Sequence, residues 1–145
     1  MVLMKRLLFV FTALVMIAAT GCKKEDAKVD NKTNLVGQWH CAPEDMEADI
    51  YVDFEKGGNF TLYQQIGEGR YRKYTGRWTC QGNTLSGTYI DGSPWGSSYK
   101  MEFSGSDTMI LTALNGSEES MTYVKETIPT EIKSNSIETK SGGSF

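Results

Sequence analysis

Apolar and polar side chains alternate with a period of two along much of this chain, between about residues 35 and 125. In one such stretch, Met101 and Phe103 alternate with Lys100 and Glu102. Successive side chains of a β-strand point to opposite faces of its sheet, so this alternation is typical of half-buried strands. No part of the region has a convincing helical period. The pattern therefore predicts that the folded part of the chain is all-β.

Short runs rich in glycine, asparagine and aspartate separate the alternating stretches and predict tight hairpin links. These runs are residues 56–59, 81–83, 91–94, 104–107 and 115–116. About eight strands are predicted, near residues 35–42, 48–55, 59–65, 71–80, 84–90, 97–104, 108–114 and 120–125. Because every link is short, an antiparallel up-and-down barrel closes these strands most simply. A sandwich of the same strands is the alternative.

The start of the sequence has the composition of a secretory signal peptide. Lys5 and Arg6 form a positive start, an apolar run follows over residues 7–19, and small residues precede Cys22. The apolar run is too short to cross ~30 Å of hydrocarbon as a transmembrane helix. We therefore predict that residues 1–21 are a signal peptide.

The end of this peptide resembles the lipobox of bacterial lipoproteins, in which a small residue precedes a lipidated cysteine. Ala19 stands where that motif usually has leucine. The resemblance implies cleavage before Cys22 and attachment of fatty acyl chains such as palmitate to this residue. Residues 24–26, of sequence Lys-Glu-Asp, also resemble the acidic export tag of surface lipoproteins in Bacteroidetes. The implied location is the bacterial outer membrane, on its periplasmic or its cell-surface side.

Two polar segments flank the alternating region, and each has too few large apolar side chains to fold alone. Residues 22–34 are predicted to be a lipid-anchored flexible tether that precedes the domain of residues 35–125. Residues 126–145 are predicted to be a disordered tail. The alternative is that one of its isoleucines docks on the domain: Ile128, Ile132 or Ile137.

The first predicted strand contains Gly37-Gln38-Trp39, which resembles the Gly-x-Trp signature of lipocalins and of the lipocalin-like domains of Bacteroidetes lipoproteins. Residues 74–78 and 81–85 resemble the same domains, and the likeness covers most of the folded region. The resemblance implies a barrel with one closed end, which Trp39 plugs, often beneath an arginine of the last strand. This chain departs from that pattern, because it has Lys125 at the end of its last strand, and Arg77 is the residue that could substitute for the arginine.

The predicted links at the two ends of the barrel differ in length and in charge. Links at the closed end are tight, whereas those at the open end are mostly longer and more acidic. We predict a candidate ligand rim at the open end, formed by an exposed Trp95 together with Glu44, Glu47, Asp91 and Glu118. Such a rim favours a cationic or glycan-like ligand, or a protein partner. The alternative is that the acidic loops are simply solvated and Trp95 folds inward as a lid.

Large side chains crowd the predicted interior, which indicates a small cavity or none. The inward positions are Trp39, Phe54, Phe60, Tyr74, Trp78, Phe103, Met109, Leu111 and Tyr123. Cys41 and Cys80 are also predicted to point inward. A disulfide between them and two buried thiols are equal alternatives, because extracytoplasmic thiols tend to pair, whereas the first and fourth strands of a meander are not neighbours.

No catalytic constellation stands out in the sequence. The single histidine, His40, is expected to face outward on the first strand, and one histidine excludes a multi-histidine metal site. The formal net charge of −3 argues against a nucleic-acid partner, which attracts a basic stripe.

We therefore predict a membrane-anchored binding or interaction module, without cofactor or metal, rather than an enzyme. Its ligand is a small molecule, a glycan or a protein. The alternatives are a structural or inhibitory lipoprotein that meets a protein through its open-end loops, and an enzyme with a site in the barrel mouth.

Overall fold

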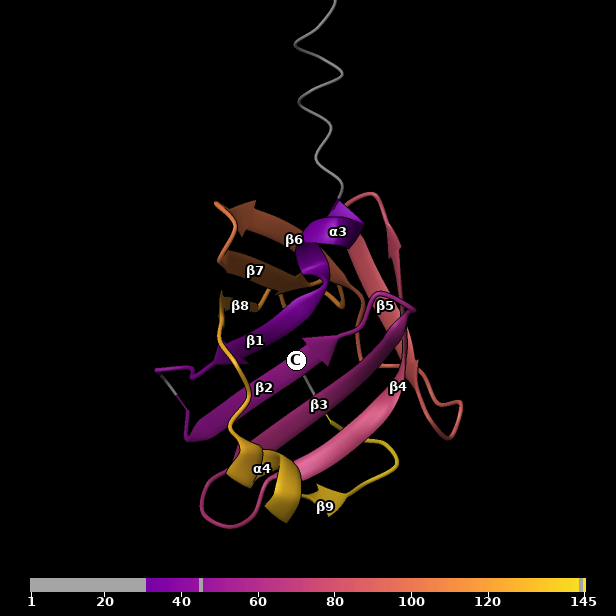
Figure 1. The fold of residues 1–145 in the computed structure, drawn as a ribbon. Helices are drawn as coiled ribbons and strands as arrows, with labels where there is room; N and C mark the ends of the chain where they lie inside the picture. Colours follow the sequence, from indigo (N-terminus) through magenta and orange to yellow (C-terminus); the bar gives the residue numbers. More distant parts are fainter. Residues whose placement is uncertain (1–30, 45, 144) are drawn as a thin grey trace, which may run out of the picture. The chain divides into compact units, whose positions relative to one another are not determined.

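The computed structural model describes residues 31–44, 46–143 and 145, so the predicted signal peptide and Cys22 lie outside the described residues. Eight antiparallel strands follow one another here and form a barrel (Figure 1). They are β1 (Gly37–Cys41), β2 (Ala48–Phe54), β3 (Asn59–Ile66), β4 (Arg72–Gln81), β5 (Thr84–Tyr89), β6 (Tyr99–Ser104), β7 (Thr108–Ala113) and β8 (Ser120–Lys125). Because β8 pairs with β1 and β3 pairs with β4, the ring is closed. The predicted all-β, up-and-down barrel is confirmed, and the sandwich alternative is excluded.

The alternation along the strands decides which side chains form the core. On β7, for example, Met109, Leu111 and Ala113 are buried and the residues between them are half-buried. Full burial of a large apolar side chain contributes about 1.5–3 kcal/mol, so the inner face of each strand drives the closure. The predicted inward positions are buried except Phe103 and Cys80, which are half-buried and pack against the core. The Phe103 ring lies beside that of Trp39, with centroids 6.2 Å apart.

The β5–β6 seam of the barrel is short, and the link between these strands completes the wall. β5 and β6 pair only at Thr84 with Lys100 and at Leu85 with Tyr99. Beyond these pairs, residues 90–98 fold back, and the backbone N–H of Trp95 donates to the Gly87 carbonyl oxygen at 3.0 Å. A Cβ atom at Gly87 would lie 2.5 Å from atoms of the Trp95 ring, so only glycine leaves room for the indole.

A short helix, α3 (Asn31–Leu35), precedes β1, so the predicted tether over residues 22–34 extends too far. Leu35 is fully buried, and the Asn31 side-chain amide donates to the Gly82 carbonyl oxygen at 2.9 Å. The Lys32 Nζ atom lies 5.9 Å from the centroid of the Trp78 ring. These contacts order residues 31–34, which were predicted to belong to the tether because of their polar composition.

Residues 126–145, hereafter the wrapping segment, are largely ordered, so the prediction of a disordered tail is wrong. Its described residues contain α4 (Thr130–Asn135) and β9 (Ile137–Glu138), which pairs parallel with the start of β4. Figure 1 shows the segment crossing the outside of β1 and β2 before α4. Ile128 is 2% exposed in a cluster with Tyr51 and Tyr63, on the outer face of β2 and β3. The segment is too polar to fold alone, but the finished barrel offers apolar sites to its few large side chains.

Within the residues that the structure describes, no helix has the length and apolar character needed to cross a membrane.

Candidate functional site

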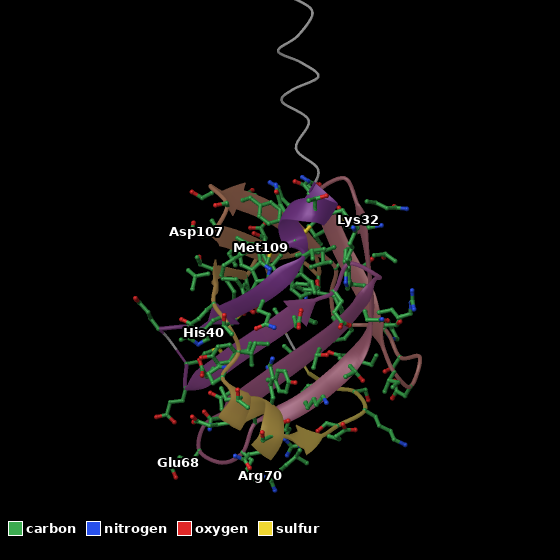
Figure 2. All side chains as sticks on the ribbon, viewed as in Figure 1. Lys32, His40, Glu68, Arg70, Asp107 and Met109 are labelled. Atoms are coloured by element: carbon green, nitrogen blue, oxygen red, sulfur yellow. The ribbon has the colours of Figure 1, made fainter. Side chains whose placement is uncertain are left out.

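The two ends of the barrel are distinguished by their links and by α3. The tight links that follow β2, β4 and β6 lie at the end that α3 covers, which is the closed end. The links that follow β1, β3, β5 and β7 lie at the opposite, open end. Figure 2 shows Lys32 and Asp107 at the closed end, and Glu68 and Arg70 at the open end.

Trp39 lies in the core near the closed end. Its side chain is fully buried, and its Nε1 atom donates to the Leu35 carbonyl oxygen at 2.8 Å. The Lys125 Nζ atom lies 5.1 Å from the centroid of the indole ring and donates to the Val36 carbonyl oxygen at 3.2 Å. Lys125, not Arg77, is therefore the basic residue over this tryptophan, in a cation–π contact.

Aromatic rings from four strands and from the 90–98 link line the interior, and we call this set the aromatic chamber: Phe54, Phe60, Tyr89, Trp95 and Tyr99. The ring centroid of Phe60 lies 5.1 Å from that of Trp95 and 6.1 Å from that of Tyr89, both edge-on. The Trp95 and Tyr99 centroids are 6.4 Å apart. The ring of Phe145, from the wrapping segment, lies among them.

Trp95 is not part of an exposed rim, which corrects the sequence prediction. The side chain is 6% exposed and packs inside the barrel, as the lid alternative requires. Burial of a large aromatic surface against Gly87 outweighs the polarity of the surrounding loop. The four predicted acidic rim residues are all exposed: Glu44, Glu47, Asp91 and Glu118.

Asp91 has a local role in its turn. Its carboxylate accepts hydrogen bonds from the Ser93 backbone N–H at 2.9 Å and from the Ser93 hydroxyl at 2.5 Å. The hydrogen bonds from Ser93 lower the pKa of Asp91. The carboxylate therefore serves the turn after β5 and does not reach the buried indole of Trp95.

Two buried polar atoms of the interior have no hydrogen-bond partner among the described residues: Trp95 Nε1 and Tyr123 Oη. Burial raises the pKa of Tyr123 well above its usual range, and burial likewise raises the pKa of Tyr89 to about 12. These phenols therefore stay neutral and able to donate. No aspartate, glutamate, lysine, arginine or histidine among the described residues is fully buried. The interior thus suits an uncharged ligand that has an apolar body and a hydrogen-bond acceptor.

A groove of about 720 Å³ opens where β1 and β8 separate at the open end. These strands pair only at Trp39 with Lys125 and at His40 with Val124. The groove is lined by Cys41, Ala42, Pro43, Glu44, Met46, Glu119, Ser120, Met121 and Thr122. Cys41, one of the lining residues, also belongs to the barrel core. Of the predicted rim residues, Glu44 is the one that lines it.

The profile of the lipocalin-like domain matches residues 23–111. The chain belongs to the lipocalin-like domain family. The match ends within β7 and leaves β8 and the wrapping segment outside it. Lipocalin-like domains are typically binding proteins rather than enzymes, and they commonly bind small molecules. No curated protein matches this sequence.

In this lipocalin-like barrel, Cys41 and Cys80 do not form a disulfide. Cys41 is a buried thiol, and the Cys80 Sγ atom donates to the Gly82 carbonyl oxygen at 3.5 Å. β2 and β3 separate β1 from β4, so the two cysteines are not on neighbouring strands. The alternative of two buried thiols holds for Cys41 alone, because Cys80 is half-buried.

We expect native Cys41 to resist alkylation by iodoacetamide at pH 8. Burial, together with the charge of Asp49, raises the pKa of Cys41 to about 11, so the reactive thiolate is scarce as well as inaccessible. Mass-spectrometric mapping should find Cys41 modified in denaturant and unmodified without it. Rapid labelling of Cys41 in the native protein would show that the groove exposes this thiol.

An outward-facing cluster around His40 ties the wrapping segment to the barrel. The His40 Nε2 atom lies 2.5 Å from Asp49 Oδ1, and its Nδ1 atom lies 2.9 Å from Glu126 Oε2. The imidazole stacks on Tyr51 with centroids 4.1 Å apart, and the Tyr71 hydroxyl donates to Asp49. Each imidazole nitrogen therefore faces a carboxylate oxygen, one from β2 and one from the wrapping segment.

The His40 cluster has a structural role in the lipocalin-like domain. No group of three or more histidine, cysteine, aspartate or glutamate side chains in the described residues could hold a metal ion. The cluster also contains no serine or cysteine that the imidazole could activate. His40 faces outward as predicted, but its partner Glu126 lies 86 residues away in the sequence, and no local pattern indicates their contact.

Proposed function

We propose that this protein is a lipid-anchored binding protein of the bacterial outer membrane, whose barrel takes a small uncharged ligand with an aromatic or apolar body. The observation that carries the proposal is a pair of buried donors in the interior, Trp95 Nε1 and Tyr123 Oη, which have no hydrogen-bond partner within the described part of the chain. An unpaired buried donor costs about 1–3 kcal/mol. A ligand acceptor that pairs with either group therefore recovers this energy on binding.

The predicted chemistry of the ligand changes with the placement of Trp95. The indole faces the interior, so it offers its ring and its N–H to a molecule inside the barrel and not to a cation at an acidic rim. The predicted rim acids remain at the surface, where they are solvated. The proposal therefore replaces a cationic or sugar-like ligand by a neutral apolar one.

The proposed ligand is tested with the neutral aromatic ketone 6-propionyl-2-(dimethylamino)naphthalene, hereafter the naphthyl ketone. We expect saturable binding that quenches tryptophan fluorescence. Tyr123→Phe removes one donor without changing the ring, so binding should weaken about 2- to 12-fold, which corresponds to a net hydrogen bond of 0.5–1.5 kcal/mol. Tyr63→Phe, in the outer cluster, is the matched control and should bind as the wild type does. Unsaturable partitioning, unaffected by Tyr123→Phe, would contradict the proposal.

The proposed anchor rests on the lipobox-like sequence that ends at Cys22. The chain enters the barrel through α3 at the closed end. We propose the outer membrane, on its periplasmic or cell-surface side, as the location.

Replacement Cys22→Ser is expected to abolish membrane association, because stable anchoring takes at least two hydrophobic signals and this residue would carry them. Detergent phase partitioning and intact mass would measure the loss of lipid. Cys80→Ser is the control and should remain in the detergent phase. A Cys22→Ser protein that is still lipidated and processed normally would disprove the anchor.

A protein partner at the open end is the second candidate function, and one observation favours it. Large aliphatic side chains are exposed beside the open-end links: Met46, Ile66, Ile90 and Leu114, each 50–69% exposed. A photo-crosslinking amino acid at position 90 should then yield one defined adduct in intact cells. The same group at exposed Lys100 should yield none.

A further inference from the structure

Phe145 occupies the aromatic chamber of the barrel as an internal aromatic ligand would. Its ring centroid lies 4.3 Å from that of Trp95, 5.8 Å from that of Phe60 and 5.9 Å from that of Tyr99. The side chain is 7% exposed, and its backbone forms a hydrogen bond with the Tyr99 hydroxyl. Figure 1 marks this end of the chain with C, which falls over β2 in this view. The chamber is therefore already filled by one phenyl group.

Gly143, which has no side chain, lies where the wrapping segment enters the chamber, and the space there is too narrow for a larger residue. A Cβ atom at Gly143 would lie 3.0 Å from carbon atoms of both Leu62 and Tyr74, which are tight contacts. The Tyr89 hydroxyl donates to the Gly143 carbonyl oxygen at 2.5 Å. Leu62, Tyr74 and Tyr89 are all core residues of the barrel. The wrapping segment thus enters the interior along a slot that the barrel walls define.

Outside the chamber, this part of the wrapping segment is held by contacts at the surface of the barrel. They include the hydrogen bond from Arg70 Nε to the Asn135 carbonyl oxygen at 2.8 Å and the ion pair between Lys73 and Glu138 at 3.5 Å. Between Ile128 and Phe145, none of the described residues is buried. β9 pairs with β4 at two positions, and the Thr139 N–H donates to the Lys73 carbonyl oxygen at 2.8 Å. Segments with few buried contacts open at a small fraction of the free energy of global unfolding. Phe145 can therefore leave the chamber while the eight-stranded ladder stays intact.

We propose that residues 139–143 and Phe145 belong to a displaceable intramolecular plug, which competes with an aromatic ligand for the chamber and leaves when that ligand binds. The proposal rests on the proposed function, because it needs a ligand of the interior. It also narrows that ligand to one with a ring of about the size of a phenyl group at this level of the barrel. The plug shields Phe54, Phe60 and Trp95 from water in the absence of ligand and lowers the apparent affinity for it.

The size of the effect follows from the fraction of molecules whose chamber is open. The apparent dissociation constant equals the intrinsic one divided by that fraction. If the plug is seated in about nine molecules of ten, its removal strengthens binding about tenfold. A comparison of the ligand concentration needed for half-saturation with and without the plug therefore gives the fraction of molecules in which the plug is seated.

The test compares binding of the naphthyl ketone by the full chain and by three variants. Phe145→Ser removes the ring, and Gly143→Val blocks its entry without changing the chamber walls. Both should bind about tenfold more tightly than the wild type. Lys140→Ser, at an exposed position of the same segment, is the matched control and should leave the affinity unchanged. Two plug variants that act at different atoms keep the test decisive if one of them folds poorly.

NMR of the Phe145 ring supplies the second measurement. The ring lies beside Trp95, so its protons should be shifted by the indole ring current in the unliganded protein. Saturating ketone should return them to the values of a solvated phenylalanine, and the Phe145→Leu spectrum assigns them. Tighter binding by both plug variants together with this shift would establish the plug.

The outcomes separate the plug from the proposed function. If the ketone binds, Tyr123→Phe weakens binding, and both plug variants bind as the wild type does with an unchanged Phe145 signal, the plug is disproved and the interior site stands. If the wild type and both plug variants fail to bind the ketone, the proposed interior site fails and the plug fails with it.

Discussion

Replacement Trp39→Ala is expected to lower the free energy of unfolding by about 3–5 kcal/mol, as large-to-small changes of buried aromatic residues do. The indole is fully buried, so its loss leaves a cavity in the core near the closed end. It also leaves the Leu35 carbonyl oxygen without its donor and Lys125 without the ring beneath it. Such a loss is a large share of the 5–15 kcal/mol that typically stabilises a domain. Urea unfolding followed by circular dichroism would measure it.

The control for this prediction separates packing from the hydrogen bond. Trp39→Phe keeps an aromatic ring in the core but lacks the N–H that reaches Leu35. Trp39→Phe should therefore lower the free energy of unfolding by clearly less than Trp39→Ala does. A change of less than ~1 kcal/mol for Trp39→Ala would mean that Trp39 is not part of the core.

Replacement Gly76→Ala is expected to lower the free energy of unfolding by about 1–3 kcal/mol or more, because it overpacks a rigid part of the barrel. A Cβ atom at Gly76 would lie 2.0 Å from the Thr88 carbonyl oxygen and 2.9 Å from the Tyr89 Cα atom. Both are backbone atoms, so β5 would have to move away from β4. Gly76 pairs with Phe60 on one side and with Tyr89 on the other, which leaves the strand little freedom to adjust.

Gly57→Ala is the matched control for this second prediction. A Cβ atom at Gly57 meets nothing within 4 Å, and the residue has no positive φ angle. The change should stay within about 0.5 kcal/mol of the wild type, as is usual for surface positions. If Gly76→Ala and Gly57→Ala unfold at the same urea concentration, β4 and β5 do not approach as closely as the structure shows.

The strands and the barrel were predictable because their signals are local. The period of two identifies the inner face of each strand from its own residues, and short links restrict each strand to pair with the next. The resemblance of Gly37-Gln38-Trp39 to the Gly-x-Trp signature indicated the family, which the profile match over residues 23–111 confirms. The lipoprotein context indicated by Cys22 stays a prediction.

Trp95 shows where local composition is misleading. It lies between proline and glycine in a polar link, and such a context usually indicates an exposed loop. The decisive neighbour is Gly87, which leaves a recess for the indole. This recess exists only because β5 and β6 pair at two positions and then separate.

The sequence alone determined the all-β class, the number and order of the eight barrel strands, the inner face of each and the tryptophan that packs near the closed end, but it missed β9. Each of these depends on residues close together along the chain. Only the tertiary structure showed that residues 126–145 are largely ordered, which residues His40 contacts and which side chain occupies the aromatic chamber. Phe145 has no reason to be ordered in its own polar segment, because burial needs a partner surface. That surface is assembled from β2, β3, β6 and the 90–98 link, and it exists only once the barrel has closed.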